Sequence, residues 1–210
     1  MELKKRAGEI LKILKELYPD AKAELNYSNP FELLIATILS AQTTDVTVNK
    51  ITPELFKKYP TLALLSKSKQ TDVERIIKPS GFYHNKAKNI IETSKIIVEK
   101  FNGKVPDDME GLLKLKGVSR KTANVVLANA FKKNEGIAVD THVKRLSYRI
   151  GLTKKTEPEK IEKDLMILFD KKDWGFISNA LILHGRRVCN AKKPLCDECK
   201  INKYCEKNIQ

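Results

Sequence analysis

The feature that most constrains the fold is an apolar stretch from Phe31 to Ala41, in which nearly every side of a helix would be hydrophobic. Asn29 and Pro30 precede it, and this pair is typical of a helix start, with Asn as the cap and Pro at the first helical position. A helix that is hydrophobic all round cannot lie on a surface and has to be enclosed by other elements. The stretch therefore predicts a helix at the centre of a core.

The rest of the chain also shows helical periodicity, without a convincing pair of strands. The predicted helix boundaries are two capping boxes at Thr71–Glu74 and Thr156–Glu159, a capping residue at Asp107 and a helix end at Asn102-Gly103. These signals predict an all-α fold with roughly ten helices.

The charge of the chain indicates a polyanionic partner. Lys and Arg number 40 against 26 Asp and Glu, which gives a formal net charge of +14. Such an excess suits nucleic acid or an acidic membrane face, although a merely Lys-rich composition would give the same count. No stretch approaches the ~18 apolar residues of a membrane-spanning helix, and the N-terminus has no apolar region typical of a signal peptide. We therefore expect a soluble, cytoplasmic protein that binds no membrane.

Four cysteines lie close together near the C-terminus. They are Cys189, Cys196, Cys199 and Cys205, in the pattern C-x6-C-x2-C-x5-C. Disulfides are rare inside cells, so this grouping predicts a metal site. Four thiolates suit either Zn²⁺ or an iron–sulfur cluster, and the spacing does not separate the two. His184 precedes the group and is expected to be a packed, hydrogen-bonded residue and not a ligand.

A short turn between two helical segments is a candidate phosphate site. The first helix is expected to end near Lys114, and the second to begin at Arg120. Gly117 permits a tight turn, and Ser119 is placed to cap the second helix. The backbone N–H groups and the dipole of such a helix N-terminus favour an anion, for instance a DNA phosphate. An ordinary turn that binds nothing also fits the local sequence.

Several motifs in one order resemble the endonuclease III family of helix-hairpin-helix DNA glycosylases. They are L-S-A-Q-T-T-D at 39–45, G-F-Y-H-N-K-A at 81–87, L-K-G-V-S-R-K-T-A-N-V-V at 115–126, V-D-T-H-V-K-R at 139–145, L-H-G-R at 183–186 and the four cysteines. The family hairpin usually reads L-P-G-V-G. Lys116 therefore lacks the stiffness of a proline, and Ser119 replaces a glycine. We expect the turn to survive with Ser119 in the β region.

The resemblance implies a two-domain helix-hairpin-helix glycosylase fold. Residues 23–133 would form a six-helix barrel domain that contains the helix-hairpin-helix at about 107–132, and residues 1–22 plus 134–210 would form a helical iron–sulfur domain. The segment 132–136 is the candidate linker. The resemblance also implies a [4Fe-4S] cluster on the four cysteines, in preference to zinc.

The resemblance further implies a bifunctional DNA glycosylase and AP (abasic-site) lyase of base excision repair. Such an enzyme removes oxidised pyrimidines from duplex DNA and cleaves the 3′ side of the abasic site by β-elimination. The expected partner is double-stranded DNA with a damaged pyrimidine or an abasic site. A monomer associated with the nucleoid is expected.

Two alternatives stay open at this point. One is a monofunctional glycosylase of the same superfamily, such as an adenine-excising enzyme. Lys121 argues against it, because those enzymes usually lack this amine, and 210 residues leave no room for a further recognition domain. The other is a non-catalytic DNA-binding module with structural zinc, which would need neither Lys121 nor Asp140.

The family's catalytic residues correspond to Lys121 and Asp140 in this chain. A neutral amine displaces the base at C1′ and forms a Schiff base, from which β-elimination follows. An ordinary lysine has a pKa near 10.4, and lowering it to about 7 costs about 4–5 kcal/mol. A helix N-terminus supplies only about 0.3–2 kcal/mol, so desolvation and the neighbouring Arg120 have to supply the rest. Asp140 is expected to cap the next helix, relay a proton and stabilise the cationic sugar.

The resemblance also implies contacts to DNA. The target base has to leave the stack; Gln42 lies where the family fills the vacated space, and Phe82 where it wedges into the opposite strand. Alternatively, Gln42 is a polar helix end and Phe82 a core aromatic. The other expected DNA-binding residues are Lys116, Gly117, Val118, Ser119, Arg120, His142, Lys192 and Lys193, and the last two would form a basic knob with Arg186 and Arg187.

Overall fold

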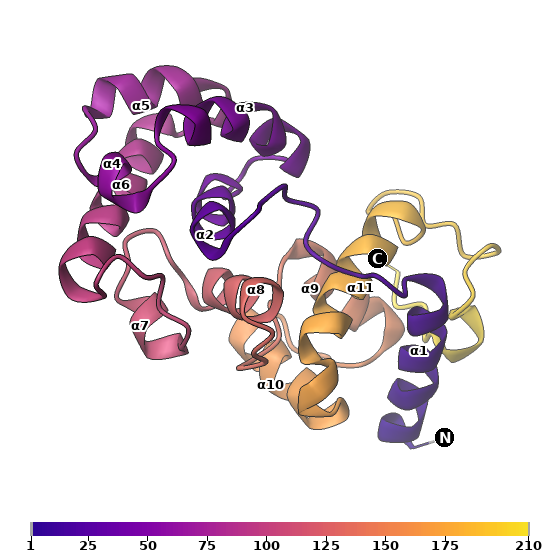
Figure 1. Cartoon of the computed structure of the whole chain (residues 1–210). Helices are drawn as coiled ribbons and strands as arrows, with labels where there is room; N and C mark the ends of the chain where they lie inside the picture. The colour runs from indigo at the N-terminus through magenta and orange to yellow at the C-terminus, as the bar shows by residue number, and fades with distance from the viewer. Residues whose placement is uncertain (1, 210) are drawn as a thin grey trace. The chain divides into compact units, whose positions relative to one another are not determined.

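The chain is a two-unit helical protein. The computed structural model describes residues 2–209 and has, over that range, eleven α-helices, three 3-10 helices and no strand (Figure 1). The all-α fold class is therefore confirmed. The chain divides into two compact units, which we name the inner unit (Glu24–Lys133) and the terminal unit (Met1–Ala23 with Asn134–Gln210).

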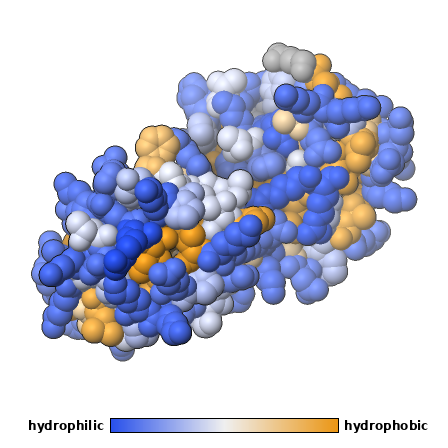
Figure 2. All heavy atoms as spheres, turned by 90° about the horizontal axis from the view of Figure 1, so that it is seen from above, coloured by the Kyte–Doolittle hydropathy of each residue, from blue (hydrophilic) through white to orange (hydrophobic). Residues whose placement is uncertain are grey.

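The surface is largely polar, as the composition of the chain leads one to expect. On the face shown in Figure 2, hydrophilic residues predominate and hydrophobic residues form small separate groups. Among residues 2–209, no helix has both the length and the apolar character needed to cross a membrane.

The inner unit is built around α2. Its elements are α2 (Pro30–Leu39), α3 (Asp45–Lys58), α4 (Leu62–Ser66), α5 (Gln70–Ile77), the 3-10 helix η1 (Lys78–Ser80), α6 (Tyr83–Lys100), α7 (Met109–Leu113) and α8 (Arg120–Ala130). α2 packs against α3, α6 and α8, while α6 also packs against α4 and α5. This arrangement encloses α2.

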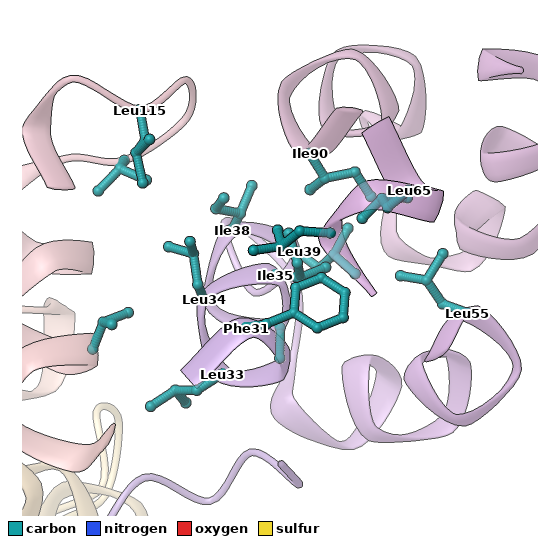
Figure 3. Packing of buried hydrophobic residues seen from close by; sticks show 14 of the residues in the cluster. Phe31, Leu33, Leu34, Ile35, Ile38, Leu39, Leu55, Leu65, Ile90 and Leu115 are labelled. Atoms are coloured by element: carbon teal, nitrogen blue, oxygen red, sulfur yellow. The ribbon is translucent and has the colours of Figure 1, made fainter. Parts of the chain in front are cut away.

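The sequence signals at the start of α2 and along it are confirmed. The Asn29 side chain accepts a hydrogen bond from the backbone N–H of Glu32 at 3.0 Å, and Pro30 is the first helical residue. Every residue from Phe31 to Leu39 is buried except Glu32. Figure 3 shows side chains of α2 pointing to several sides of the helix. Around them lie Leu55 of α3, Leu65 of α4, Ile90 of α6 and Leu115, which follows α7.

The terminal unit joins the two ends of the chain in one core. Its elements are α1 (Leu3–Leu17), α9 (Thr141–Ile150), α10 (Pro158–Leu168), η2 (Lys171–Asp173), α11 (Trp174–Arg187) and η3 (Asn202–Tyr204). α1 packs against α10 and α11, and the Arg6 guanidinium forms an ion pair with Glu206 at 2.9 Å. In Figure 1 the indigo helix α1 lies beside the yellow C-terminal segment.

The predicted start of α7 is one residue too early. Asp108, not Asp107, caps this helix, and its carboxylate accepts a hydrogen bond from the N–H of Gly111 at 2.8 Å. Asp107 instead pairs with the ammonium of Lys133 at 2.5 Å. Two adjacent aspartates compete for the cap, and a partner distant in sequence decides between them.

Both predicted capping boxes are wrong, whereas the predicted helix end is correct. α5 begins at Gln70, before Thr71, and α10 begins at Pro158, so Glu157 occupies the cap position that we had assigned to Thr156. A proline favours the first helical position, because it has no N–H to satisfy there. α6 ends at Lys100, and the N–H of Gly103 bonds the carbonyl of Ile97 at 3.0 Å.

Two neighbouring leucines of α4 test whether the enclosed core carries the stability of the inner unit. Leu65 is fully buried, whereas Leu64 is 51% exposed. Leu65→Ala should lower the free energy of unfolding by about 2–5 kcal/mol, because it leaves a cavity. Leu64→Ala on the same helix should change it by no more than about 0.5 kcal/mol. Urea denaturation measures both, and equal losses would contradict the packing described above.

Candidate functional site

The segment between α7 and α8 forms a helical hairpin, as predicted. Gly117 lies in the left-handed region with φ +74°. Ser119 lies in the β region, and its hydroxyl accepts a hydrogen bond from the N–H of Thr122 at 3.4 Å. Ser119 is therefore the N-cap of α8, and the turn forms with serine where the family usually has glycine.

The hairpin rests on the core through contacts with α6. The Thr93 hydroxyl donates a hydrogen bond to the carbonyl of Lys116 at 2.8 Å. A Cβ on Gly117 would lie 3.0 Å from the side-chain nitrogen of Asn89, so the two segments approach closely. Val118 is buried in the core, which leaves only its backbone for a ligand. Lys116, Ser119 and Arg120 are exposed.

Lys121 is the second residue of α8, in the first helical turn after the hairpin. Its side chain is exposed, whereas the next three residues of the helix, Thr122 to Asn124, are buried. The buried face anchors the helix while the lysine projects from it. The chain by itself therefore leaves the Lys121 amine in contact with water.

Gln42 and Phe82 lie on two turns of the inner unit. Gln42 lies between α2 and α3, and Phe82 immediately precedes α6. Both are exposed, Phe82 to 67%, which rules out the core interpretation of this aromatic ring. Both also have a left-handed backbone, with φ +53° at Gln42 and φ +46° at Phe82.

Sequence reasoning missed a buried lysine beneath these two turns. Lys86 of α6 is 5% exposed, and its ammonium donates hydrogen bonds of 2.7 Å to the Thr43 hydroxyl and of 2.7 Å to the Ser80 carbonyl. Burial lowers the pKa of Lys86. Its position four residues before the buried Ile90 was a signal that placed it on the inner face of the helix.

Asp140 caps α9 in the terminal unit, as predicted. Its carboxylate accepts a hydrogen bond from the N–H of Val143 at 2.8 Å, and the residue is half-buried. His142 is also half-buried, with Nδ1 3.2 Å from the guanidinium of Arg145. Burial is the main cause that lowers the pKa of His142, so the neutral imidazole predominates at neutral pH.

The four cysteines are half-buried and line one pocket. Its other walls are mostly apolar and include Leu146, Ile150, Val188 and Ile201. Burial raises the pKa of the Cys199 and Cys205 thiols, and the other thiolates of the group raise it further. Four thiolates at this place would need a cation, and their chemistry fits an iron–sulfur cluster. Within residues 2–209, no group of three or more His, Cys, Asp or Glu is arranged to hold a single metal ion.

Two arginines of α9 hold the cysteine segment, and the sequence analysis did not identify them. Arg149 is 7% exposed and donates to the carbonyls of Asn190 at 2.8 Å and Ala191 at 2.7 Å. Its guanidinium also lies 3.6 Å from the sulfur of Cys189. Arg145 donates to the Cys189 carbonyl at 2.9 Å. Nothing in the local sequence shows that Arg149 is buried and Arg145 half-buried.

His184 is a packed, hydrogen-bonded residue, as expected. It is 1% exposed, its Nδ1 lies 3.0 Å from the Tyr18 hydroxyl and its Nε2 3.3 Å from the Cys199 sulfur. Burial lowers the pKa of His184 to about 4, so the ring is neutral at pH 7. Lys192, Lys193, Arg186 and Arg187 are all exposed, and Arg187 also lies over the Tyr18 ring at 5.8 Å.

The site residues fall into two groups, one in each unit. The inner unit carries Gln42, Phe82, the hairpin and Lys121, and the terminal unit carries Asp140, His142, Lys192, Lys193 and the cysteines. Within the inner unit, the hairpin brings a candidate phosphate site and an exposed amine together. Within the terminal unit, α9 has Asp140 as its N-cap, and its Arg145 and Arg149 side chains bond the cysteine segment.

Comparison with known proteins places this arrangement in a family. The HhH-GPD superfamily base excision DNA repair protein model matches residues 35–171. An endonuclease III of Synechocystis sp. is 55% identical over 202 residues, which cover 96% of this chain and 92% of that protein. The chain belongs to the endonuclease III family. It is therefore a bifunctional DNA glycosylase and AP lyase of base excision repair, as the motifs had implied.

Solved endonuclease III structures have the same fold. A trapped endonuclease III–DNA covalent intermediate, an estranged-adenine complex, matches with a TM-score of 0.93 at 41% identity, over 99% of this chain and 97% of that one. A non-covalent endonuclease III–DNA complex gives the same TM-score, identity and coverage. Both of those structures are complexes with DNA.

Two glycines test the close fit of the hairpin. Gly117 and Gly103 have nearly the same backbone, φ +74° and +73°, but a Cβ meets Asn89 only at Gly117. Each substitution by alanine should cost about 1–2 kcal/mol for the left-handed backbone. Gly117→Ala should cost more and should also weaken DNA binding in this endonuclease III, because it displaces the hairpin. Urea denaturation and DNA titration compare the two, and equal losses in both measurements would contradict the fit against Asn89.

Proposed function

We propose that Lys121 is the nucleophile with which this endonuclease III excises oxidised pyrimidines from duplex DNA. The observation that supports this most is the position of its exposed amine, two residues after the Ser119 cap of α8. A phosphate held by the N-terminal N–H groups of α8 would bring the sugars of that strand close to this amine. The exposed lysines of the hairpin segment itself, Lys114 and Lys116, both lie before the helix.

The proposed reaction has two stages. The neutral Lys121 amine attacks C1′, the bond from C1′ to the base breaks, and the base leaves with the electron pair and takes up a proton. Opening of the sugar ring then gives a Schiff base between the lysine nitrogen and C1′. Loss of a C2′ proton allows the C3′–O bond to break, and the phosphate leaves on the 3′ side.

Bound DNA completes the activation of the amine. Because Lys121 is exposed, the protein alone does not desolvate its ammonium. A duplex that covers α8 would remove this water and disfavour the charged form, with the helix N-terminus and the adjacent Arg120 adding to the effect.

We propose that Asp140 relays the proton and stabilises the cationic sugar as the base departs. Its bond to the N–H of Val143 holds the carboxylate in one orientation before DNA binds. A group that is already oriented needs no rearrangement in the transition state. The cap and the catalytic role are therefore compatible in one residue.

The remaining residues that we assign to DNA contacts suit double-stranded DNA that carries a damaged pyrimidine or an abasic site. The target nucleotide has to leave the stack, and we assign Gln42 to the vacated space and Phe82 to the opposite strand. Lys116 to Arg120, His142, Lys192 and Lys193 would contact the backbone. One chain carries both proposed catalytic residues, so we propose that a monomer acts, on the nucleoid.

We assign a [4Fe-4S] cluster to the four cysteines. The Arg149 guanidinium lies 3.6 Å from the Cys189 sulfur, and the backbone N–H of Lys207 lies 3.3 Å from the Cys205 sulfur; such donors stabilise the negative charge of thiolate ligands. The cluster, when bound, supplies metal–thiolate bonds that hold a segment too small for a core of its own. The ordered segment presents Lys192 and Lys193 to phosphates.

Borohydride trapping on abasic-site DNA tests the nucleophile. The unmodified protein should form a covalent complex with DNA, and Lys121→Ala should abolish it, because the Schiff base cannot form. Lys100→Ala, which removes an exposed lysine at the end of α6, is the control and should trap normally. A Lys121→Ala protein that still traps at the normal rate would disprove the assignment.

Asp140→Asn separates the cap of α9 from the carboxylate charge. Asparagine caps helices as well as aspartate does, so thermal stability should change little. Excision of thymine glycol from a duplex should fall by about 100-fold or more, because the charge that stabilises the sugar is lost. Unchanged excision would disprove the catalytic role.

The metal assignment is tested by colour and composition. The purified protein should be yellow-brown and contain iron and inorganic sulfide, and Cys199→Ser should lower the content of both. Colourless protein with stoichiometric zinc would show that the cysteines form a zinc site instead.

A further inference from the structure

The turns that carry Gln42 and Phe82 are joined by a network of three polar groups. The Lys86 ammonium lies 2.7 Å from the Thr43 hydroxyl and 2.7 Å from the Ser80 carbonyl. The Thr43 hydroxyl also donates a hydrogen bond to the Ser80 carbonyl. Thr43 follows Gln42 directly, and Ser80 lies two residues before Phe82. Both partners of Lys86 therefore lie within two residues of a residue that we assign to DNA insertion.

The donors and acceptors of this network are consistent with one another. An ammonium has three N–H donors, a hydroxyl can donate and accept, and a carbonyl accepts two hydrogen bonds. Lys86 donates to both turns, and Thr43 accepts from Lys86 while it donates to Ser80. A second link runs through the backbone, where the N–H of Lys86 bonds the carbonyl of Phe82 at 3.1 Å. One residue thus contacts both turns.

The burial of Lys86 is costly and calls for a reason. The residue is 5% exposed, and both polar partners that bind its ammonium within residues 2–209 are neutral oxygens. A buried charge without a counter-ion costs free energy, so an apolar residue at this position would stabilise the fold at least as well. What an apolar side chain cannot do is donate to two segments at once.

The two turns have backbones that need external support. A left-handed conformation is unusual for residues with a side chain, and it is strained for a bulky aromatic such as Phe82. Gln42 and Phe82 both adopt it while their side chains are exposed. Their own side chains therefore provide little packing, and hydrogen bonds from beneath have to hold the backbone.

We propose that Lys86 is a positioning residue that fixes the spacing between the Gln42 and Phe82 turns, so that both side chains enter the duplex together when the target nucleotide leaves the stack. The proposal rests on the DNA-inserting roles assigned to Gln42 and Phe82. Lys86 acts through those two residues and touches neither substrate nor reacting atoms.

The first measurement needs no DNA and follows hydrogen exchange in the purified, full-length protein. Lys86→Met keeps the length of the side chain and removes its donors. Exchange should become faster in peptides that cover residues 40–45 and 79–84, because both turns lose their shared hydrogen bonds. Lys95→Met removes an exposed lysine from the same helix and should leave both segments unchanged. Unchanged exchange in either turn of the Lys86→Met protein would overturn the proposal.

A second variant keeps the test valid should Lys86→Met fold poorly. Thr43→Val removes the acceptor of the first turn at a half-buried position and retains Lys86. It should also accelerate exchange in both segments. The acceleration of exchange in the Lys86→Met/Thr43→Val double variant should be smaller than the sum of the two single-variant accelerations, because both changes break one network. Fully additive effects would overturn the shared network.

Activity then links the network to DNA insertion. Excision of thymine glycol from a duplex should fall by about 10- to 100-fold in Lys86→Met, because the two side chains are misplaced. Borohydride trapping on a single-stranded abasic oligonucleotide, which needs no displacement from a stack, should stay normal. Equal losses on both substrates would indicate general damage to the fold and overturn the positioning role.

Gln42→Ala and Phe82→Ala separate this proposal from the function on which it rests. Both should lose duplex excision and keep single-strand trapping. If Gln42→Ala and Phe82→Ala lose duplex excision and Lys86→Met retains it, the positioning role fails and the proposed DNA contacts stand. If Gln42→Ala and Phe82→Ala both retain duplex excision, the proposed DNA contacts fail, and the positioning role of Lys86 fails with them.

Discussion

The inner unit depends on enclosing one helix that is hydrophobic on almost every side. Each fully buried Leu or Ile contributes about 1.5–3 kcal/mol, so exposure of any face of α2 would cost more than a domain of this size can lose. α3, α6 and α8 therefore have to surround it. The helix that carries Lys121 and the turn that carries Gln42 are held in place by this packing, because α8 lies against α2 and the turn leaves the end of α2.

Both proposed catalytic residues lie at helix N-termini. Lys121 is in the first turn of α8, behind the Ser119 cap, and Asp140 is itself the cap of α9. A helix start exposes N–H groups and a positive dipole end, which attract phosphate and disfavour an ammonium. The cap also fixes where the helix begins and so where the side chain projects. The residues proposed for catalysis thus lie at the same helix starts whose N–H groups and caps can bind phosphate.

Buried and half-buried cations hold the irregular segments of both units. Lys86 joins two turns of the inner unit, and Arg149 with Arg145 fastens the cysteine segment of the terminal unit through carbonyl groups. Such segments have little apolar area to bury, so packing alone cannot order them. A long side chain with several donors can span the gap and satisfy carbonyls that would otherwise be buried without partners. The segments that we assign to DNA and to the cluster are ordered in this way.

The features that depend on neighbouring residues could be predicted before the fold was known. The all-α class, the central helix with its Asn29 cap, and the caps Ser119 and Asp140 follow from local propensity, hydrogen bonding within a few residues and hydrophobic periodicity. The spaced motifs were sufficient to predict the family. Local signals failed at Thr71 and Thr156, because capping boxes compete with other possible starts. The packing of α1 with the C-terminal helices was implied by the resemblance alone, and the burial of Lys86 and Arg149 became evident in the folded protein. Both depend on contacts between residues far apart in the chain, which local sequence does not encode.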